Sequence, residues 1–370
     1  MTATQGTHGS NDMKNVRPIR VGIIGTGGIA SAHIQGYQKT EGVELFGACD
    51  VVKERAEAAQ EKFGFKHVFT SYEEMLKQPE LDAVSICTPP FAHKEPTIAA
   101  LEAGKHVLCE KPMALNADEA QEMVDAWHRA RVTHKNLFSI GFNARWGSNA
   151  QTLKRMIDAG ELGDIYYGRT VSHRRRGVPA WGVFTNKAKN GGGPMIDIGV
   201  HALDLALWLM GHPQPESVYG VTYRKFGNRP NVFNPWGQWD PKTYDVEDSA
   251  FATIRFKGGA SLQLECSWAL NIEKSYGQTI LCGTEGGAQL QPFMLFQEKH
   301  GTLLDVVPPS QATEGQSGQR ESTHGLEVQG FIRAIRDGTD PLVLPEQALM
   351  VSRIVDAVYA SDESGEAIRL

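Results

Sequence analysis

The sequence predicts an α/β fold for the first part of the chain and an α+β fold for the second. The 370 residues are enough for about two domains of ordinary size. Up to about residue 145, short apolar runs alternate with helix-like stretches, which is typical of a parallel sheet covered on both faces. Beyond that point, apolar runs follow one another closely and favour a large, mostly antiparallel, open-faced sheet. We therefore predict a disordered leader over residues 1–16, a first domain over 17–145 and a second over 146–370.

The first domain begins with a buried strand, the apolar run I-R-V-G-I-I-G from Ile19, and a helix follows T-G-G-I-A. Apolar, β-branched runs predict four more strands. They cover Val43–Cys49, Ala83–Cys87, His106–Cys109 and Leu137–Phe142. The polar stretches between them predict helices over about Lys53–Phe63, Tyr72–Lys77, Pro96–Ala103 and Ala117–Arg131.

The second domain opens with a helix over Asn149–Ala159, a strand over Ile165–Ser172 and a helix over Met195–Met210. Turn dipeptides such as Gly258-Gly259 and Gly286-Gly287 then separate further strands. These strands are predicted over Ser217–Phe226, Ser249–Phe256, Ala260–Leu270, Gln278–Cys282 and Ala288–Glu298. After a loop that begins V-P-P-S-Q-A-T, two helices over His324–Asp337 and Glu346–Ala360 close the chain. The sequence leaves open whether these helices pack back on the first domain.

Composition excludes several classes of protein. Lys and Arg number 37 against 43 Asp and Glu, so the net charge of −6 does not match the basic footprint of nucleic-acid binders. No apolar stretch reaches the length of a membrane helix, and the polar start lacks a signal-peptide core. The five cysteines, an odd number without a C-x-x-C pair, fit neither a disulfide framework nor a zinc site. We therefore expect no nucleic-acid, membrane or metal partner, and a reducing, cytoplasmic setting.

A glycine-rich turn follows the first strand, with the spacing G-x-G-x-x-A. It consists of Gly25, Thr26, Gly27, Gly28, Ile29 and Ala30. The first glycine suits a tight turn, and the second lets a pyrophosphate approach the backbone. The free N–H groups of the following helix would point at those phosphates. Small-residue clusters are also common turns, but the flanking strand and helix favour a dinucleotide site of the Rossmann type.

Asp50 ends the second predicted strand, 25 residues after Gly25. A carboxylate at this place accepts hydrogen bonds from the ribose hydroxyls of NAD and repels the 2′-phosphate of NADP. The sequence therefore favours NAD. Lys53 and Arg55 lie close enough to leave NADP possible, and a solvated strand-end charge is the alternative interpretation of Asp50.

Two other stretches predict the chemistry. Lys111 follows a strand within Glu110-Lys111-Pro112, at the edge where doubly wound sheets bind ligands. In G-G-G-P-M-I-D-I-G-V-H-A-L-D, Asp197 and His201 are four residues apart, on one face of the predicted helix. Each has a structural alternative: Lys111 as a surface lysine, Asp197 as a helix cap, and His201 as a core histidine or metal ligand.

With these motifs in order, the sequence resembles the Gfo/Idh/MocA family, whose members include glucose–fructose oxidoreductase and inositol dehydrogenase. The resemblance covers about residues 18–365 and includes T-P-P with a following histidine, E-K-P and the G-G-G segment. It implies a Rossmann domain followed by an open-faced sheet domain. It also implies a homodimer or homotetramer formed through that sheet.

The resemblance assigns roles to matching positions only. Lys111 would contact the nicotinamide ribose and the substrate hydroxyl, Asp197 would position substrate or histidine, and His201 would act as acid/base. Cofactor-side positions are Thr88, Pro89, His93 and Glu110. The segment containing Asn143, Arg145 and Trp146 would enter the active-site cleft.

These roles fit the oxidation of a secondary alcohol by nicotinamide. A neutral histidine is suited to remove the hydroxyl proton at physiological pH, and a lysine cation stabilises a developing alkoxide. The opposite assignment of His201 and Lys111 stays open. On the substrate side, His173, Arg176 and Trp181 lie in a loop that suits a polyhydroxylated ring, although tandem arginines are often solvated and tryptophans often lie in the core.

The predicted function is an NAD-dependent dehydrogenase that acts on a sugar, glycoside or inositol hydroxyl. Two alternatives remain at this stage. One is a non-catalytic, dinucleotide-sensing sugar regulator on the same fold, for which an intact lysine and histidine would be unnecessary. The other is an NAD-using, redox-neutral glycosidase.

Overall fold

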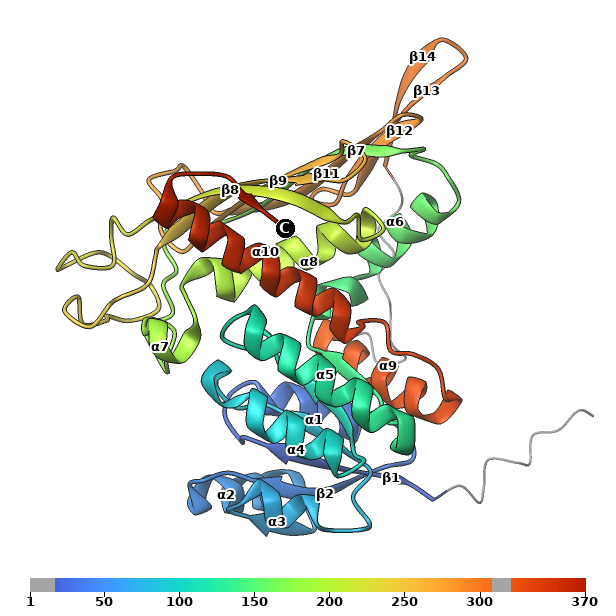
Figure 1. Cartoon of the computed structure of the whole chain (residues 1–370), viewed down its shortest axis with the longest axis vertical. Coiled ribbons are helices and arrows are strands. Elements are labelled where there is room, and N and C mark those ends of the chain that lie inside the picture. The colour runs from blue at the N-terminus through green and yellow to red at the C-terminus, as the bar shows by residue number, and fades with distance from the viewer. Residues whose placement is uncertain (1–16, 308–320) are drawn as a thin grey trace, which may run out of the picture.

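The computed structural model describes residues 17–307 and 321–370, so the predicted leader and most of the loop that begins V-P-P lie outside the described residues. Two sheets form separate layers, and helices lie between them (Figure 1). The fold is therefore α/β, with a parallel sheet near the N-terminus and a larger, mostly antiparallel sheet beyond it, as the sequence predicts. The boundary of the two domains near residue 145 stays a prediction.

The first sheet has six parallel strands in the order β3-β2-β1-β4-β5-β6. The strands are β1 (Ile19–Ile24), β2 (Val43–Cys49), β3 (His67–Phe69), β4 (Ala83–Ile86), β5 (His106–Cys109) and β6 (Phe138–Ile140). Strand β3 was not predicted, because three residues are too few to show a periodicity. The carboxyl ends of β1, β4 and β5 lie side by side, so the turns that follow them share one edge of the sheet.

Helices cover both faces of this sheet. They are α1 (Ala30–Gln38), α2 (Lys53–Phe63), α3 (Tyr72–Leu76), α4 (Lys94–Glu102) and α5 (Ala117–His134), with short 3₁₀ turns η2 (Pro90–Ala92) and η3 (Asn143–Trp146). Helices α4 and α5 pack together over one face. Helix α1 covers the other face, where Ile34 shares a buried cluster with Val328 from the far end of the chain.

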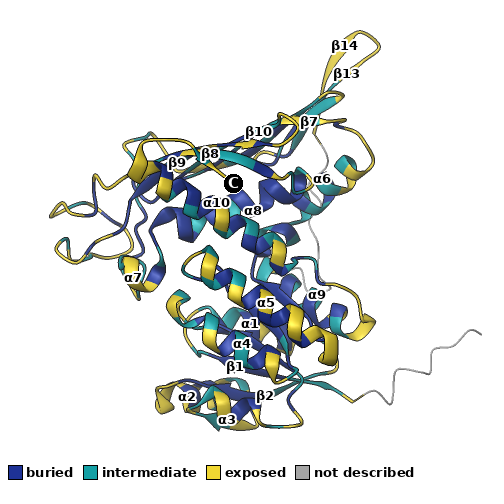
Figure 2. Ribbon diagram, viewed as in Figure 1, coloured by how far each residue is buried: buried dark blue, intermediate teal, exposed yellow. Residues whose placement is uncertain are grey.

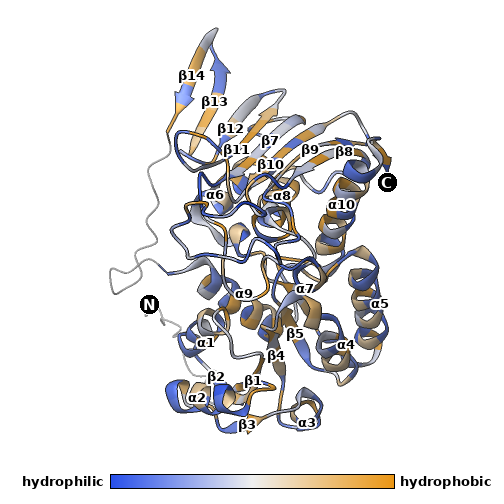
Figure 3. Cartoon of the chain, turned by 90° about the vertical axis from the view of Figure 1, so that its left-hand side faces the viewer, coloured by the Kyte–Doolittle hydropathy of each residue, from blue (hydrophilic) through white to orange (hydrophobic). Residues whose placement is uncertain are grey.

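The second sheet has nine strands in the order β14-β13-β12-β11-β7-β10-β9-β8-β15. The strands are β7 (Ile165–His173), β8 (Pro215–Tyr223), β9 (Ser249–Phe256), β10 (Ser261–Ser267), β11 (Tyr276–Gly283), β12 (Gly286–Gln289), β13 (Met294–Lys299), β14 (Thr302–Val306) and β15 (Ile368–Arg369). The pair β7 and β10 is parallel. The single strand expected over Ala288–Glu298 is wrong, because the chain turns around Pro292 and forms two strands there. Strands β13 and β14 project as a hairpin (Figures 1 and 3).

The remaining helices pack against one face of the second sheet or return to the first. They are α6 (Ser148–Asp158), α7 (Lys187–Asn190), the π-helical turn η4 (Met195–Gly199), α8 (Val200–Leu209), α9 (Thr323–Asp337) and α10 (Pro345–Ser364). Helix α10 packs on β8 and also contacts α5. Helix α9 packs on α1, where Gly36 leaves room for Val328. The last helices therefore tie the two sheets together, which the sequence had left open.

The two faces of the second sheet differ in what covers them. Along β9, Ala252 and Ile254 are buried toward the helices, whereas Thr253 and Arg255 are exposed on the opposite face. The helix-covered face is therefore the core, and the other face stays open (Figure 2). Within the described ranges, none of the helices combines the length and the apolar character needed to cross a membrane.

Candidate active site

The loop after β5 meets the turn η4 at the junction of the two sheets. The Nζ atom of Lys111 donates to the carbonyl oxygen of Asp197 at 2.8 Å and to its Oδ1 atom at 3.1 Å. Lys111 comes from the edge of the parallel sheet, and Asp197 comes from the second domain, 86 residues later. The structure therefore brings together two of the three predicted catalytic residues.

The glycines before η4 allow this turn to pack closely. A Cβ atom on Gly192 would clash with the hydroxyl of Tyr359, and one on Gly193 would clash with the carbonyl oxygen of Glu247. The Glu247 carboxylate accepts hydrogen bonds from the N–H groups of Gly193 at 2.9 Å and Met195 at 3.1 Å. These bonds satisfy free N–H groups at the start of the helical segment and fix the position of η4.

Asp197 is 9% exposed and has partners on both carboxylate oxygens. Besides Lys111, the Nε1 atom of Trp268 donates to its Oδ2 atom at 2.9 Å, and Nη1 of Arg174 lies 3.5 Å from the same oxygen. Burial alone raises the pKa of Asp197, but the cations of Lys111 and Arg174 outweigh it and lower the pKa below its ordinary value. Asp197 is therefore an anion that holds two cations in the site.

His201 lies at the start of α8, and its Nδ1 atom is buried with no hydrogen-bond partner among the described residues. The edge of its ring packs against Phe142, with ring centroids 6.2 Å apart. Burial and the nearby Lys111 cation lower the pKa of His201 to about 3. The imidazole is therefore neutral near pH 7 and available as a base.

The sequence predicts that Asp197 and His201 lie on one helix face and act together. No hydrogen bond joins the two side chains in the part of the chain that the structure describes, and the Asp197 oxygens are occupied by other donors. Asp197 lies in the π-helical turn over Met195–Gly199, and His201 follows in the first turn of α8.

The turn after β1 leaves room for a dinucleotide. Gly25 has φ +87°, and a Cβ atom there would lie 2.8 Å from the backbone nitrogen of Thr88. Gly27 and Gly28 face open space, with no atom within 4 Å of a Cβ atom built on them. Helix α1 begins at Ala30 without an acidic residue in its first turn. The backbone, Thr26 and Ile29 included, therefore forms a cradle that fits a pyrophosphate.

Asp50 lies beside this cradle at the end of β2. Its Oδ2 atom accepts hydrogen bonds from the N–H group and the hydroxyl of Thr26, at 3.0 and 3.1 Å, and its Oδ1 atom accepts from the N–H of Val52 at 2.9 Å. Each carboxylate oxygen accepts two hydrogen bonds, so Oδ1 has capacity left for a ribose hydroxyl. Asp50 thus also shapes the turn, which the sequence did not predict.

Glu110 turns away from the open cradle into a buried network. Its Oε1 atom lies 2.7 Å from Nε2 of His33, whose Nδ1 atom lies 3.1 Å from the hydroxyl of Ser85. Its Oε2 atom accepts a hydrogen bond from the N–H of Lys111 at 3.1 Å. Burial opposes ionisation of Glu110, but His33 and Lys111 outweigh this and lower the pKa to about 2. Glu110 therefore positions the Lys111 backbone, and His33 is a supporting residue that the sequence did not reveal.

His93 bridges the two loops that are predicted to face the cofactor, those after β4 and β5. Its Nδ1 atom lies 2.8 Å from the carbonyl oxygen of Pro112, and its Nε2 atom lies 2.8 Å from that of Thr88. His93 is 1% exposed, and its ring joins the loops after β4 and β5. Pro89, by contrast, is exposed.

The segment over 143–146 contributes less to the site than the resemblance implied. Arg145 is fully buried, and its Nε and Nη2 atoms donate to the carboxylate of Asp204 at 2.9 and 2.7 Å. A substrate contact through Arg145 does not fit this position. Trp146 lies against Gly330 of α9. The amide of Asn143 lies 2.7 Å from Nε2 of His324, at the start of α9.

The predicted substrate loop divides between the two faces of the second sheet. His173 lies on the open face, where its ring packs against Phe251 and Tyr276, so the structure does not bring it to the site. Alternation along β7 instead turns Arg174 toward Asp197. Arg176 donates to the carbonyl of Leu270 at 2.9 Å and does not contact the catalytic residues. The structure therefore does not bring these two predicted substrate residues to Lys111 and Asp197.

Trp181 is 54% exposed and packs against Trp236, with ring centroids 5.9 Å apart. Trp268 was not among the predicted site residues, whereas Arg174 belongs to the predicted substrate loop that begins at His173. Trp268 lies within the predicted strand over Ala260–Leu270 and carries no motif that would have revealed its role. Within the described residues, no group of His, Cys, Asp and Glu is arranged to hold a metal ion.

Comparisons with known proteins agree with this geometry. A model described as "Oxidoreductase family, NAD-binding Rossmann fold" matches residues 19–138, and one described as "GFO/IDH/MocA C-terminal domain" matches residues 150–289. The chain is 38% identical to the D-glucoside 3-dehydrogenase of Escherichia coli (strain K12), over 95% of this chain and 98% of the relative. It is 25% identical to the myo-inositol 2-dehydrogenase of Thermotoga maritima, over 95% and 98%. Levoglucosan dehydrogenase in complex with NADH superposes with a TM-score of 0.80 at 23% identity, covering 95% of this chain and 99% of that one.

Proposed function

The chain belongs to the Gfo/Idh/MocA family of NAD-binding oxidoreductases, and from that premise we propose that it oxidises the C3 hydroxyl of a D-glucoside. The proposal rests mainly on the contact of Lys111 with Asp197, which holds a cation at the junction of the two sheets, where it lowers the pKa of His201. The choice of a glucoside, and of its C3 hydroxyl, rests on the name of the relative that is 38% identical over nearly the whole chain.

In this proposal, His201 removes the proton of the substrate hydroxyl. Its lowered pKa keeps the imidazole neutral across the physiological range, so the base form is always present. The Nδ1 atom of His201 is buried without a partner, and its ring lies at 77° to that of Phe142, so the exposed part of the imidazole is left for the substrate. When NAD⁺ is bound, it supplies the acceptor for the hydride that leaves the carbon.

Lys111 stabilises the alkoxide that forms as the proton leaves. An ammonium has three N–H donors, and two of them are directed at the carbonyl and the carboxylate of Asp197. These acceptors hold the third donor in a fixed direction for the substrate oxygen. Because two donors of Lys111 are already bound to Asp197, we assign Lys111 as the group that stabilises the alkoxide and His201 as the base, and not the reverse.

Cofactor binding is assigned to the backbone at Gly25, Gly27 and Gly28, and to Asp50. The open space at the last two glycines fits the pyrophosphate, and the Oδ1 atom of Asp50 is the proposed acceptor for a ribose hydroxyl. A carboxylate at this position repels a 2′-phosphate, which supports NAD over NADP. Thr88 and Pro89 form the opposite side of the turn, with the Thr88 hydroxyl donating to Ala92 at 2.7 Å.

The test is NADH formation at 340 nm with a panel of methyl and aryl glucosides, free aldoses and inositols. The proposal expects turnover with glucosides and a 3-keto product. If the enzyme oxidises inositols but not glucosides, the proposed substrate class is wrong while the dehydrogenase activity stands. No absorbance change with any compound, although NAD binds, would contradict the proposed reaction.

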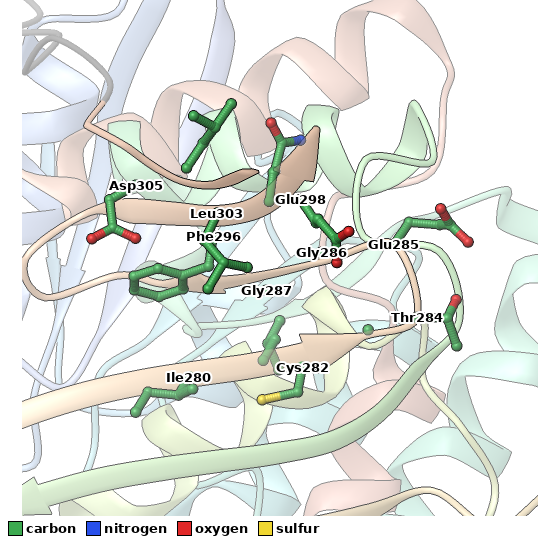
Figure 4. A pocket seen from close by; sticks show the side chains of 14 residues that line it. Ile280, Cys282, Thr284, Glu285, Gly286, Gly287, Phe296, Glu298, Leu303 and Asp305 are labelled. Atoms are coloured by element: carbon green, nitrogen blue, oxygen red, sulfur yellow. The ribbon is translucent and has the colours of Figure 1, made fainter. Parts of the chain in front are cut away.

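The open face of the second sheet is proposed as the surface through which copies of this chain associate into a homodimer or homotetramer. It carries partly exposed aromatic side chains, among them Tyr219, Tyr223 and Tyr276. A hollow lined by Cys282, Phe296 and other residues lies on the strands near the β13–β14 hairpin (Figure 4). Exposed apolar area of this kind typically marks a protein interface. Light scattering after gel filtration should therefore give twice or four times the mass of 40.6 kDa.

The state of the cysteines supports a reducing compartment. All five are free thiols, and four of them are buried. Burial raises the pKa of Cys49 to about 12, so its thiol is unreactive near neutral pH. We therefore retain the cytoplasm as the proposed location.

A further inference from the structure

We propose that Trp181 and Trp236 form a second subsite, which binds the aglycone of the glucoside while the glucose ring lies at Lys111 and His201. This inference rests on the proposed function and specifies its substrate class: a glucoside with a ring-containing aglycone, either aromatic or a second sugar. The two tryptophans are 54% and 43% exposed, which is unusual for the largest apolar side chain unless it has a partner to bind.

One line of contacts connects the catalytic carboxylate to Trp236. The Nη1 atom of Arg174 lies 3.5 Å from Oδ2 of Asp197. The guanidinium carbon of the same side chain lies 4.8 Å from the centroid of the Trp236 ring, in a cation–π arrangement. A single side chain therefore separates the reaction centre from the first exposed ring.

A second line of contacts reaches Trp181 from the same carboxylate. Trp268 donates to Oδ2 of Asp197 at 2.9 Å, and its ring lies edge-on to Phe184, with centroids 6.3 Å apart. Phe184 in turn lies edge-on to Trp181 at 6.1 Å. The ring centroids of Trp181 and Trp236 are 5.9 Å apart. The two lines of contacts therefore form a closed circuit that begins and ends at Asp197. The exposed pair is thus built as part of the active site.

The loops that carry the two tryptophans are fixed to each other. The buried Asn234 accepts a hydrogen bond from the N–H of Val178 at 3.0 Å and donates to its carbonyl oxygen at 2.9 Å. A Cβ atom on Gly177 would lie 2.9 Å from the Arg174 side chain and 3.4 Å from Trp236, so glycine permits their approach. The tryptophans are therefore held in place before a ligand arrives, which reduces the ordering cost of binding.

The position of the pair fits the aglycone rather than the oxidised ring. C1 of glucose is two carbons away from C3, so an aglycone leaves the ring at a distance from the hydroxyl that faces Lys111. The rings of Trp181 and Trp236 are tilted by 50° to each other, and each offers an apolar face to a planar ring or to the C–H face of a sugar. A methyl aglycone is too small to cover either ring.

The test compares kcat/KM for phenyl and methyl D-glucosides, using both anomers, in the wild type and in the variants Trp181→Ala, Trp236→Ala and Tyr166→Ala. Tyr166 is a matched control, because it is 56% exposed but lies seven residues from His173 along β7, roughly 23 Å away. NADH affinity and circular dichroism establish that each variant is folded. Trp181→Phe tests whether an aromatic ring is sufficient.

We expect the wild type to favour the phenyl over the methyl glucoside by roughly three- to tenfold, the range of a ring-stacking preference. In Trp181→Ala and Trp236→Ala this ratio should fall close to one, whereas Tyr166→Ala and Trp181→Phe should largely keep it. A ratio that is unchanged in both tryptophan-to-alanine variants, or a wild type without preference, would overturn the subsite. Failure of the wild type to oxidise either glucoside would instead overturn the proposed function, and the subsite with it.

Discussion

The ammonium group of Lys111 donates to both the carbonyl and the carboxylate of Asp197, at 2.8 and 3.1 Å. This contact joins the edge of the parallel sheet to the turn that leads into α8. It fixes a cation of the first domain beside His201 of the second, so catalysis depends on the relative position of the two domains.

Replacing Lys111 by alanine should reduce kcat/KM by roughly 10²–10³, because a preorganised donor to the developing oxyanion is lost. The affinity for NADH should change little, since the glycine turn and Asp50 remain intact. Steady-state kinetics and fluorescence titration measure the two effects. Lys77→Ala is the control, because Lys77 is exposed at the end of α3. A loss of less than tenfold in Lys111→Ala would contradict the assigned role.

The pH profile should lack an acid limb near 6.5. Burial and the Lys111 cation lower the pKa of His201 to about 3, so the base form persists as the pH falls from 8 to 5. The same shift makes the free energy of unfolding fall as the pH drops from 6.5 toward 3, because the unfolded chain takes up the proton first. A plot of log kcat/KM against pH, recorded where the protein is folded, checks this. A limb near 6.5 would show that His201 titrates normally or is not the base.

Replacing Asp50 by alanine should weaken NAD binding and relax discrimination against NADP. The carboxylate also accepts hydrogen bonds from Thr26 and Val52, so Asp50→Asn is the matched variant that removes charge but keeps an acceptor. We expect about tenfold weaker NADH binding for Asp50→Ala, the loss of a hydrogen bond to a charged group. Fluorescence titrations with NADH and NADPH measure both affinities. If NADH affinity is unchanged, Asp50 shapes the turn and does not hold the ribose.

Replacing Arg145 by methionine should destabilise the protein by about 3–5 kcal/mol, because Asp204 is left as an unpaired buried charge. The double variant Arg145→Met/Asp204→Leu should recover much of this loss. The KM for the sugar should stay within about threefold for the folded fraction, given that Arg145 has no exposed surface. Denaturant unfolding and kinetics test the two statements. If Arg145→Met raises KM without a loss of stability, Arg145 contacts the substrate, as the resemblance implied for its segment.

The parallel sheet and the catalytic motifs were predictable because they are local in sequence. The run I-R-V-G-I-I-G, the glycine turn and Asp50 each carry their signal within a few residues. The family resemblance made the roles of Lys111 and His201 predictable as well. The short strands β3 and β14 were not predictable, because their pairing with neighbouring strands, and not their own pattern, determines them.

The arrangement around Asp197 was less predictable, because its partners are distant in the sequence. Trp268 and Arg174 reach it from two adjacent strands, and only the strand alternation decides that Arg174 turns inward while His173 turns outward. A shift of one residue reverses that choice. The π-helical turn likewise depends on the packing of Gly192 and Gly193 against Tyr359 and Glu247 and has no sequence signature of its own.

The most direct test of the central claim uses methyl D-glucoside deuterated at C3, with the reaction followed by NADH absorbance and mass spectrometry of both products. We predict a 3-keto glucoside, one deuterium in the reduced cofactor, and a rate that falls sharply in both Lys111→Ala and His201→Asn. Deuterium that remains on the sugar while NADH forms would contradict oxidation at C3. Near-normal rates in those two variants would contradict the catalytic assignment.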